Sequence, residues 1–592
     1  MQNKKKSLIA NYDAKSFSGH ELALRRLILG CLVAVTTVGL CAWLGAIVFG
    51  NGFILLDAVV IVTFSLKALW VVLVFYSTSI GFVLRRATVL HSLELRRPSA
   101  MAPNPILGRI AVVMPVRDEN VDRFLACLRS TKASVDGTGC GDRFDYFLLS
   151  DSTRPELVSI EELKFEAWRA TQHVASHLTY RRREHPAGLK GGNLQDFCMG
   201  PGQGYEFMVV LDADSIMAGT TIVQLARIMQ ANPRIGILQC TINCIFPQST
   251  FARLFEFGHR LVWHNYILGS VWWQGERGQY RGHNAIVRIA AYAAHCRLSD
   301  LIGARAARVH VMCYDQVEGM LMHRAGYEVR ELPNSEGSYE GLPPTLFEFL
   351  VRYQRWCQGN LTNLRLLWLP GLAMMDRYHL VGVAHRFLGW PAFTIFVACA
   401  TLLAASWPGE VTFPTHSAAL LYATFLTLYF LPRWLGLIDA VICGARRYGG
   451  NIRLALGSLI DLLFTLFFVP IAMVSTTWFL IQRLFGHRAA WVPQPRTTQA
   501  LSWADAASAL WPTTVFGIAL FVFILMSAEA VLIWFLPFLA GLLLAVPFAM
   551  LTASVRANTC MKQWGLCAMP EEVTPPYELQ YLERCEREFG LP

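Results

Sequence analysis

Long apolar runs at both ends of this 592-residue chain restrict its fold more than any other feature of the sequence. The runs lie near residues 27–49, 56–84, 387–405, 417–441, 513–529 and 531–552. Most are long enough to cross the hydrocarbon core of a bilayer as helices. Only 16% of the residues are charged, against about 25% in soluble domains. We therefore predict a multi-pass membrane protein with six crossings, two each in 27–84, 387–441 and 513–552.

Basic residues beside the runs predict the orientation. Arginines follow the second and fourth runs, at positions 85, 86, 96, 97, 446, 447 and 453. Such excesses mark cytoplasmic loops, so we place the terminal segments 1–26 and 553–592 in the cytoplasm. We expect no cleavable signal peptide in residues 1–26. The apolar stretch 454–484 contains Asp461 and Pro470 and has basic residues on both sides, which favours an interfacial or re-entrant helix within 454–500.

The formal net charge of +10 raises the question of nucleic acid. No nucleic-acid motif and no basic stripe along one helix is found, and the excess charge flanks the apolar runs. We predict no nucleic-acid partner, and the lipid bilayer as the surface that these residues face. The fifteen cysteines lack paired metal-type spacing and are expected to be reduced core residues.

Residues 107–345 have soluble character and alternate short apolar strands with helical patterns. The expected strands are Ile110–Met114, Phe144–Leu149, Leu178–Tyr180, Phe207–Leu211 and Ile235–Leu238. This alternation is typical of a parallel sheet covered by helices on both faces. Ligands bind beyond the carboxyl ends of such strands. Asp118, Asp151 and the pair Asp212 and Asp214 all follow strands, so we expect them at one edge.

The Asp212-Ala213-Asp214 sequence predicts a metal site. Two carboxylates one residue apart can share a hard divalent cation, which also binds the phosphates of a substrate. Such a cation would neutralise a diphosphate and so make it a better leaving group.

Asp315 has two readings that the spacing leaves open. It follows an expected strand, Val309–Met312, and precedes an expected helix, Gln316–Ala325, with Glu318 three residues on. That spacing is typical of a capping box. A general base at a strand-to-helix corner would need the same ionised carboxylate.

A second capping box, Thr345 and Glu348, predicts the start of a helix within 346–375. Arg352, Arg355 and Trp356 share one face of it. Two guanidiniums suit a diphosphate and an indole suits a sugar ring, although a basic helix lying on lipid headgroups has the same pattern. The segment 251–266 is also amphipathic, with Arg253, Glu256 and Arg260 opposite its apolar side, and is expected on the membrane face of the domain.

Taken together, these motifs resemble membrane-integrated family 2 glycosyltransferases of the cellulose and hyaluronan synthase kind. One subgroup is closer still: the chain resembles the glucans biosynthesis glucosyltransferase H family, which builds the backbone of osmoregulated periplasmic glucans. The sequences that carry this resemblance are VMPVRDEN, YFLLSDS, YRRREHPAGLKGGNLQDF, MVVLDADSIM, YRGHNAIVR, GSYEGLPPTL, RWCQGNLTN, RYGGNIR and PEEVTPP.

The resemblance implies a GT-A (Rossmann-like) α/β glycosyltransferase domain, cytoplasmic and inserted between transmembrane helices of the bacterial inner membrane. It implies UDP-glucose as donor, a growing β-glucan as acceptor, Mg²⁺ or Mn²⁺ as the metal, inversion to a β-1,2 linkage, and acyl carrier protein as a partner. The implied roles, residue by residue, are uridine binding by Asp118 and Asp151, diphosphate binding by Lys190 and Arg355, metal binding by Asp212 and Asp214, catalysis by Asp315, acceptor stacking by Trp356, and further substrate contacts by His283, Asn284 and Arg352.

Two positions depart from the wider pattern. Arg352 stands where the synthases have Gln in Gln-x-x-Arg-Trp, and Tyr314-Asp315-Gln316 replaces Thr-Glu-Asp, so only the aspartate carries over. Trp491–Arg496 occupies the place of a gating loop. Alternatives remain: another β-glycan synthase, a non-processive transferase acting on a lipid carrier, or a non-catalytic sensor or transporter with a degenerate domain. The last would be expected to lack one of the motifs, and none is missing.

Overall fold

The computed structural model describes most of the chain. The described residues are 19–50, 53–86, 105–172, 177–298, 313–333, 336–407, 413–489, 501–527, 529 and 532–590. The expected strand Val309–Met312 and the gating-type segment Trp491–Arg496 lie outside them.

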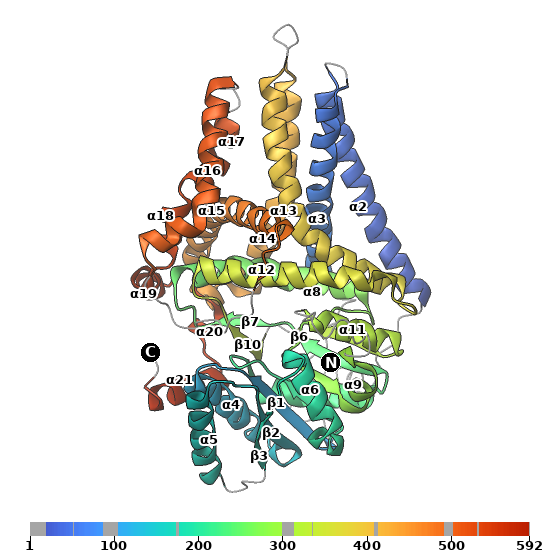
Figure 1. Ribbon diagram of the computed structural model, residues 1–592, viewed down its shortest axis with the longest axis vertical. Helices are drawn as coiled ribbons and strands as arrows, with labels where there is room; N and C mark the ends of the chain where they lie inside the picture. The colour runs from blue at the N-terminus through green and yellow to red at the C-terminus, as the bar shows by residue number, and fades with distance from the viewer. Residues whose placement is uncertain are drawn as a thin grey trace, which may run out of the picture.

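An α/β domain with a seven-stranded sheet forms the lower half of the molecule (Figure 1). Its strands are β1 (Ile110–Val116), β2 (Phe144–Ser150), β3 (Leu178–Arg182), β4 (Phe207–Val210), β6 (Ile235–Cys240), β8 (Ala285–Arg288) and β9 (Glu328–Leu332). Their order is β3-β2-β1-β4-β8-β6-β9. The five predicted strands are all present. The predicted all-parallel sheet is wrong in one strand, because β8 pairs antiparallel with both β4 and β6.

Helices cover both faces of this sheet, because successive strand residues point to opposite sides. Ile110, Val112 and Met114 pack with one helix group and Ala111 and Val113 with the other. The first group is α4 (Val121–Asp136), α5 (Pro155–Ala170), α7 (Gly219–Ala231) and α21 (Tyr577–Glu588), and the second is α6 (Leu189–Met199), α9 (Ile289–His295) and α11 (Tyr314–Arg324). The predicted α/β fold between apolar helices is confirmed.

A smaller sheet lies beside the carboxyl end of β4. Its order is β5-β10-β7, formed by β5 (Ile216–Met217), β10 (Ser338–Gly341) and β7 (Asn243–Ile245). β10 pairs antiparallel with β5, four residues after Asp212. The smaller sheet therefore ties a segment far along the chain to the Asp-x-Asp turn.

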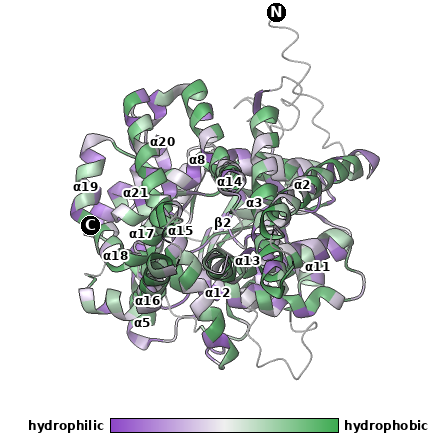
Figure 2. Cartoon of the chain, turned by 90° about the horizontal axis from the view of Figure 1, so that it is seen from above, coloured by the Kyte–Doolittle hydropathy of each residue, from purple (hydrophilic) through white to green (hydrophobic). Residues whose placement is uncertain are grey.

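Long apolar helices make up the upper half of the molecule. In the part of the chain that the structure describes, six are long and apolar enough to span a membrane: α2 (Gly19–Val48), α3 (Leu55–Arg86), α13 (Met374–Ala405), α14 (Thr415–Gly444), α15 (Asn451–Leu484) and α16 (Trp503–Ser527). The pair α17 (Leu532–Leu543) and α18 (Ala545–Thr552) adds a seventh if counted as one span. Seen from above, α13, α14 and α16 are viewed nearly end-on and are largely hydrophobic (Figure 2). The chain is thus a multi-pass membrane protein.

Two of these helices bear on the predicted count. α15, expected at the interface, passes the test for a span by length and composition, yet Figure 1 draws it across the base of the upright helices. Its interfacial placement stays a prediction. The last expected span is bent by 58° between α17 and α18, a geometry found in broken spans and re-entrant loops.

Helix α8 (Thr250–Gln274) separates the two halves and runs across the molecule, as does α12 (Leu346–Asn363) (Figure 1). α8 crosses α3 where Gly81 faces Gly269, and a Cβ at either position would overlap the backbone of the other helix. Only glycine permits so close an approach. The domain is therefore held tightly against the first group of apolar helices.

The polar side of α8 is buried, although the polar face of an amphipathic helix usually faces water. Arg253, Glu256 and Arg260 are 1%, 1% and 7% exposed. Arg253 forms an ion pair with Glu572 at 2.7 Å, and Arg260 pairs with Glu571 at 3.0 Å.

Those partners belong to the C-terminal segment, which was expected only as a polar tail. Its helices are α19 (Val555–Trp564), α20 (Pro570–Val573) and α21. Leu579 and Leu582 of α21 are 1% exposed and join the core on the face with α4. The tail is therefore a structural part of the α/β domain.

Removing the partner of a buried guanidinium should destabilise the protein. We expect Glu572→Ala to cost about 3 kcal/mol or more, because Arg253 would stay buried with its charge unpaired. Thermal unfolding of the purified protein measures the effect. Glu583→Ala is the matched control, since Glu583 pairs with Arg587 on the surface and such pairs contribute little. Equal melting temperatures for the two variants would contradict the assignment.

Candidate active site

The Asp-x-Asp turn lies at the carboxyl end of β4. This is the edge at which ligands are expected to bind in such a sheet. The ammonium of Lys190, in the first turn of α6, contacts the carboxylate of Asp212 and donates to the carbonyl of Gly282 at 2.9 Å. Asp214 is 6% exposed and accepts a hydrogen bond from the backbone N–H of Gly341 at 3.1 Å. Three separate segments thus meet at this turn.

The reversed strand β8 brings the next two residues to the same edge, because its first residue lies beside the last residue of β4. His283 Nε2 lies 3.9 Å from Asp212 Oδ2 and 3.4 Å from Glu340 Oε2. Glu340 also lies 3.7 Å from the guanidinium of Arg352 on α12. A continuous row of charged groups therefore runs from Lys190 to α12.

Asn284 has a different position from the one implied by the resemblance. Its side chain is fully buried, and its Nδ2 donates to Ser338 Oγ at 3.0 Å and to the carbonyl of Tyr339 at 3.1 Å. These bonds fix β10, which carries Glu340 and Gly341. Asn284 thus positions the edge by way of β10 and faces away from open space.

Asp118 and Asp151 form a second group at the ends of β1 and β2. Asp151 is 3% exposed and receives two bonds from Arg183, at 2.7 and 2.6 Å. Asp118 Oδ1 accepts from the backbone N–H groups of Thr153 and Arg154 at 2.9 and 3.1 Å. Partial burial opposes ionisation of Asp118, but these N–H groups outweigh it and lower its pKa.

Asp315 lies in the first turn of α11, and the predicted capping box is wrong. The helix begins at Tyr314, and the side chain of its N-cap residue, Cys313, makes no capping bond. Glu318, the expected partner, is buried and accepts from the hydroxyl of Tyr292. The box fails because the helix starts at Tyr314, two residues before the expected start at Gln316.

The surroundings of Asp315 suit an acid–base role. A Cβ at Gly282, whose φ is +88°, would lie 3.1 Å from the Asp315 Cβ, so glycine lets the two segments touch. Burial raises the pKa of Asp315 to about 6, against the N–H of Gln316 and the charges of Lys190 and His283. A carboxyl with that pKa accepts a proton near neutral pH.

Helix α12 closes the edge, and its predicted capping box of Thr345 and Glu348 is confirmed. The guanidinium of Arg352 lies over the ring of Trp356 at 4.6 Å from the centroid, and Trp356 is 40% exposed. Asn363 Nδ2 donates to the carbonyl of Cys313 at 2.9 Å. The helix with the Arg-Trp motif is thus tied to the start of the helix with Asp315.

The donor set fits a hard divalent cation held jointly with a substrate. Asp212 and Asp214 offer carboxylate oxygens, and the Asp212 side chain is 35% exposed. No group of three or more His, Cys, Asp or Glu side chains gathers as a cage among the residues that the structure describes. Mg²⁺ is commonly held by one or two carboxylates, with phosphates and water completing the shell.

Comparisons with known proteins bear on the family to which the chain belongs. No protein-family model matches the chain. A protein from Ralstonia nicotianae, described as glucans biosynthesis glucosyltransferase H, is 32% identical over 583 residues, 95% of this chain and 67% of the relative. The chain belongs to the glucans biosynthesis glucosyltransferase H family. Relatives in Pseudomonas entomophila and Cupriavidus pinatubonensis are 33% and 32% identical, and the chain spans 63% and 66% of their lengths.

Membership of the glucosyltransferase H family makes the chain a glycosyltransferase, as predicted from its motifs. Among solved structures, a mannosyltransferase from Pyrobaculum calidifontis in complex with GDP-Man and Mn²⁺ is similar at 17% identity and a TM-score of 0.37. The matched region covers 66% of this chain and 98% of the mannosyltransferase chain.

Sequence reasoning missed two residues at this edge, Arg183 and Glu340. Arg183 lies in YRRREHP and Glu340 in GSYEGLPP, both within motifs already singled out. Each motif contains a charged residue, which could have been proposed as a site residue from the sequence. Their partners, Asp151 and His283 with Arg352, are visible only in the folded chain.

Loss of the Glu340 charge should loosen both His283 and Arg352. We expect Glu340→Gln to lower turnover about tenfold, the effect of losing roughly 1.4 kcal/mol of charge-assisted contact. Donor binding should be unchanged, because Asp118, Asp151 and Lys190 are untouched. Steady-state kinetics and calorimetry separate the two effects. Glu162→Gln, at an exposed position of α5, is the control, and wild-type turnover in both variants would refute this role.

Proposed function

We propose that this chain transfers glucose from UDP-glucose to a growing β-glucan, and so builds the β-1,2-linked backbone of osmoregulated periplasmic glucans. The observation that carries the proposal is the convergence of Lys190, Asp212, His283 and Asp315 at one edge, closed by the Arg-Trp helix. Family membership supports the same reaction class.

The donor would bind across the strand ends. Asp118 and Asp151 have carboxylates that local N–H groups hold in place, which suits recognition of a uridine. Lys190, in the first turn of α6, would contact the diphosphate, because cations and helix N-termini both favour phosphate. A bound Mg²⁺ or Mn²⁺ at Asp212 and Asp214 would neutralise charge on the diphosphate leaving group.

Asp315 would remove the proton from the acceptor hydroxyl. As that oxygen bonds to the anomeric carbon of glucose, the bond from this carbon to the phosphate oxygen breaks, and the configuration inverts. Trp356 would support the acceptor ring. The guanidinium of Arg352 lies over the Trp356 ring and is itself held by Glu340. Arg355, three residues along the same helix, would contact the diphosphate.

The apolar helices would keep the enzyme in the inner membrane with its α/β domain and termini in the cytoplasm. The product would then pass outward between those helices, and the chain would act processively. Acyl carrier protein stays a predicted partner. Basic loops such as 446–453 would attract so acidic a protein.

A direct assay tests the reaction. Purified full-length protein is incubated with radiolabelled UDP-glucose and Mg²⁺, and the product is analysed for linkage and size. A ladder of β-1,2-glucans supports the proposal. A single lipid-linked glucose would instead establish the non-processive alternative, and no transfer at all would refute both.

The metal assignment predicts a charge effect at Asp214. Asp214→Asn should weaken Mg²⁺ binding in the presence of UDP at least about tenfold, because one of two ligand charges is lost. Calorimetry measures this, and melting temperature serves as the control for folding. Full activity of the wild-type protein in EDTA would overturn the assignment.

Asp315→Asn should separate catalysis from binding. Asn cannot accept a proton, so turnover should fall by roughly 10²-fold or more while UDP binding is kept. In the wild type the base must be ionised, so turnover should decline as pH falls through about 6, the raised pKa of Asp315. A variant that keeps a tenth or more of the turnover, or the same pH profile, would exclude Asp315 as the base.

A further inference from the structure

A cavity lies at the boundary between the α/β domain and the apolar helices, and its lining includes none of the residues assigned to the proposed transfer site. Its charged lining comes from four parts of the chain: Arg85 at the end of α3, Arg260 and His264 in α8, Asp439 and Arg447 at and beyond the end of α14, and Glu571 in α20. The space that these residues surround, including its open mouth, is about 560 Å³. Part of that space is open solvent in front of the mouth.

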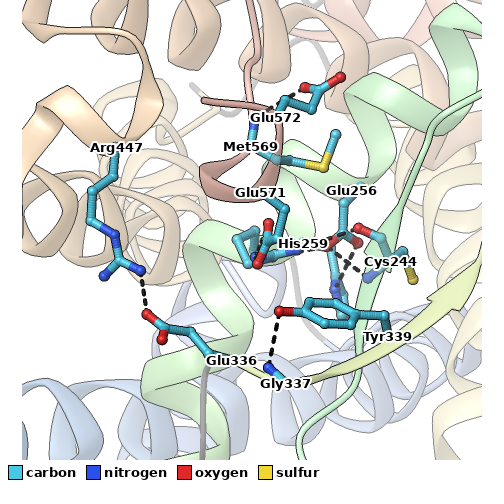
Figure 3. Close-up of polar contacts among 11 residues, drawn as sticks. Cys244, Glu256, His259, Glu336, Gly337, Tyr339, Arg447, Met569, Glu571 and Glu572 are labelled. Carbon is cyan, nitrogen blue, oxygen red and sulfur yellow. Dashed lines mark hydrogen bonds and ion pairs between the residues drawn. The ribbon is translucent and has the colours of Figure 1, made fainter. Parts of the chain in front are cut away.

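Positive charge exceeds negative charge on one side of this cavity. Arg85 and Arg86 share a single carboxylate, that of Asp439, at 3.2 and 2.8 Å. Arg447 pairs with Glu336, which does not line the cavity, and both side chains are partly exposed, at 49% and 36% (Figure 3). On the other side Arg260 has two carboxylates, Glu256 and Glu571, at 2.9 and 3.0 Å. The excess therefore lies between Arg85 and Arg447.

The pKa of His264 is affected by the same positive charges. Burial lowers its pKa well below the usual value, and the positive charges of Arg85, Arg260 and Arg447 lower it further. It stays neutral at physiological pH and keeps one N–H to donate. A neutral donor between arginines suits an anionic oxygen.

The apolar surface next to the cavity faces outward. Val83 of α3 and Ile438 and Ile442 of α14 are 61%, 45% and 63% exposed. These residues stand within the last two turns of helices long enough to span a bilayer. Arg85 and Arg447, which line the cavity, therefore stand at the ends of apolar helices, the level at which lipid phosphates meet acyl chains.

We propose that this cavity binds the phosphate of an anionic membrane lipid, held by Arg85 and Arg447 with His264 as a further donor. Free inorganic phosphate has the same chemistry and is the competing source. The acyl chains of a lipid would lie against the exposed residues of α3 and α14, which favours the lipid. The site is separate from the proposed transfer reaction.

The test uses the full chain in nanodiscs of phosphatidylcholine with limiting phosphatidylglycerol. Native mass spectrometry measures retained phosphatidylglycerol for the wild type and for the double variant Arg85→Gln, Arg447→Gln. We expect retention to weaken at least about tenfold, because two charge-assisted contacts are lost. Both substitutions should fold, since Asp439 keeps Arg86 and Glu336 is partly exposed.

Arg446→Gln is the matched control, an exposed arginine of the same turn that does not line the cavity. It should retain lipid like the wild type. Equal retention in the double variant would overturn the proposal. Inorganic phosphate that displaces the lipid completely and binds equally well in phosphatidylcholine alone would assign the site to free phosphate. Glucose transfer is measured in parallel, and its absence in every protein would bear only on the proposed function.

Discussion

The crossing of α3 over α8 is the contact on which the rest of the structure depends. At Gly81 and Gly269 the two helices approach to backbone contact, so the membrane helices and the α/β domain cannot move apart without breaking it. The same helix α8 carries the buried arginines that hold the C-terminal segment. One helix therefore joins membrane, domain and tail, and its charges are tolerated only because each is paired.

Pairing of charges also organises the catalytic edge. Asp151 is neutralised by Arg183, Asp212 by Lys190, and Glu340 lies between His283 and Arg352. These pairs hold carboxylates in place before any donor arrives, which lowers the reorganisation that binding requires. Asp315 is the exception, because burial raises its pKa and leaves it suited to accept a proton.

Much of the fold is readable from local pattern. Three of the first four strands, β1, β2 and β4, are largely apolar and fully buried, and Asp212 and Asp214 follow β4, whose sequence is Phe-Met-Val-Val. Thr345 and Glu348 form the capping box that their spacing predicts. At Asp315 the same reasoning failed by two residues, since the helix starts at Tyr314 and not at Gln316. Capping patterns show that a helix begins nearby, while neighbouring segments decide the residue at which it starts.

The sequence by itself determined the apolar helices, the alternating α/β domain and the carboxylates at its strand ends. These follow from the periodicity and length of local segments, which need no knowledge of their neighbours. Tertiary structure alone decided that β8 runs backwards and delivers His283, that Asn284 holds β10, and that Glu571 and Glu572 reach α8. The physical reason is that a buried charge or a strand direction is settled by its partner, and here many of those partners lie tens to hundreds of residues away.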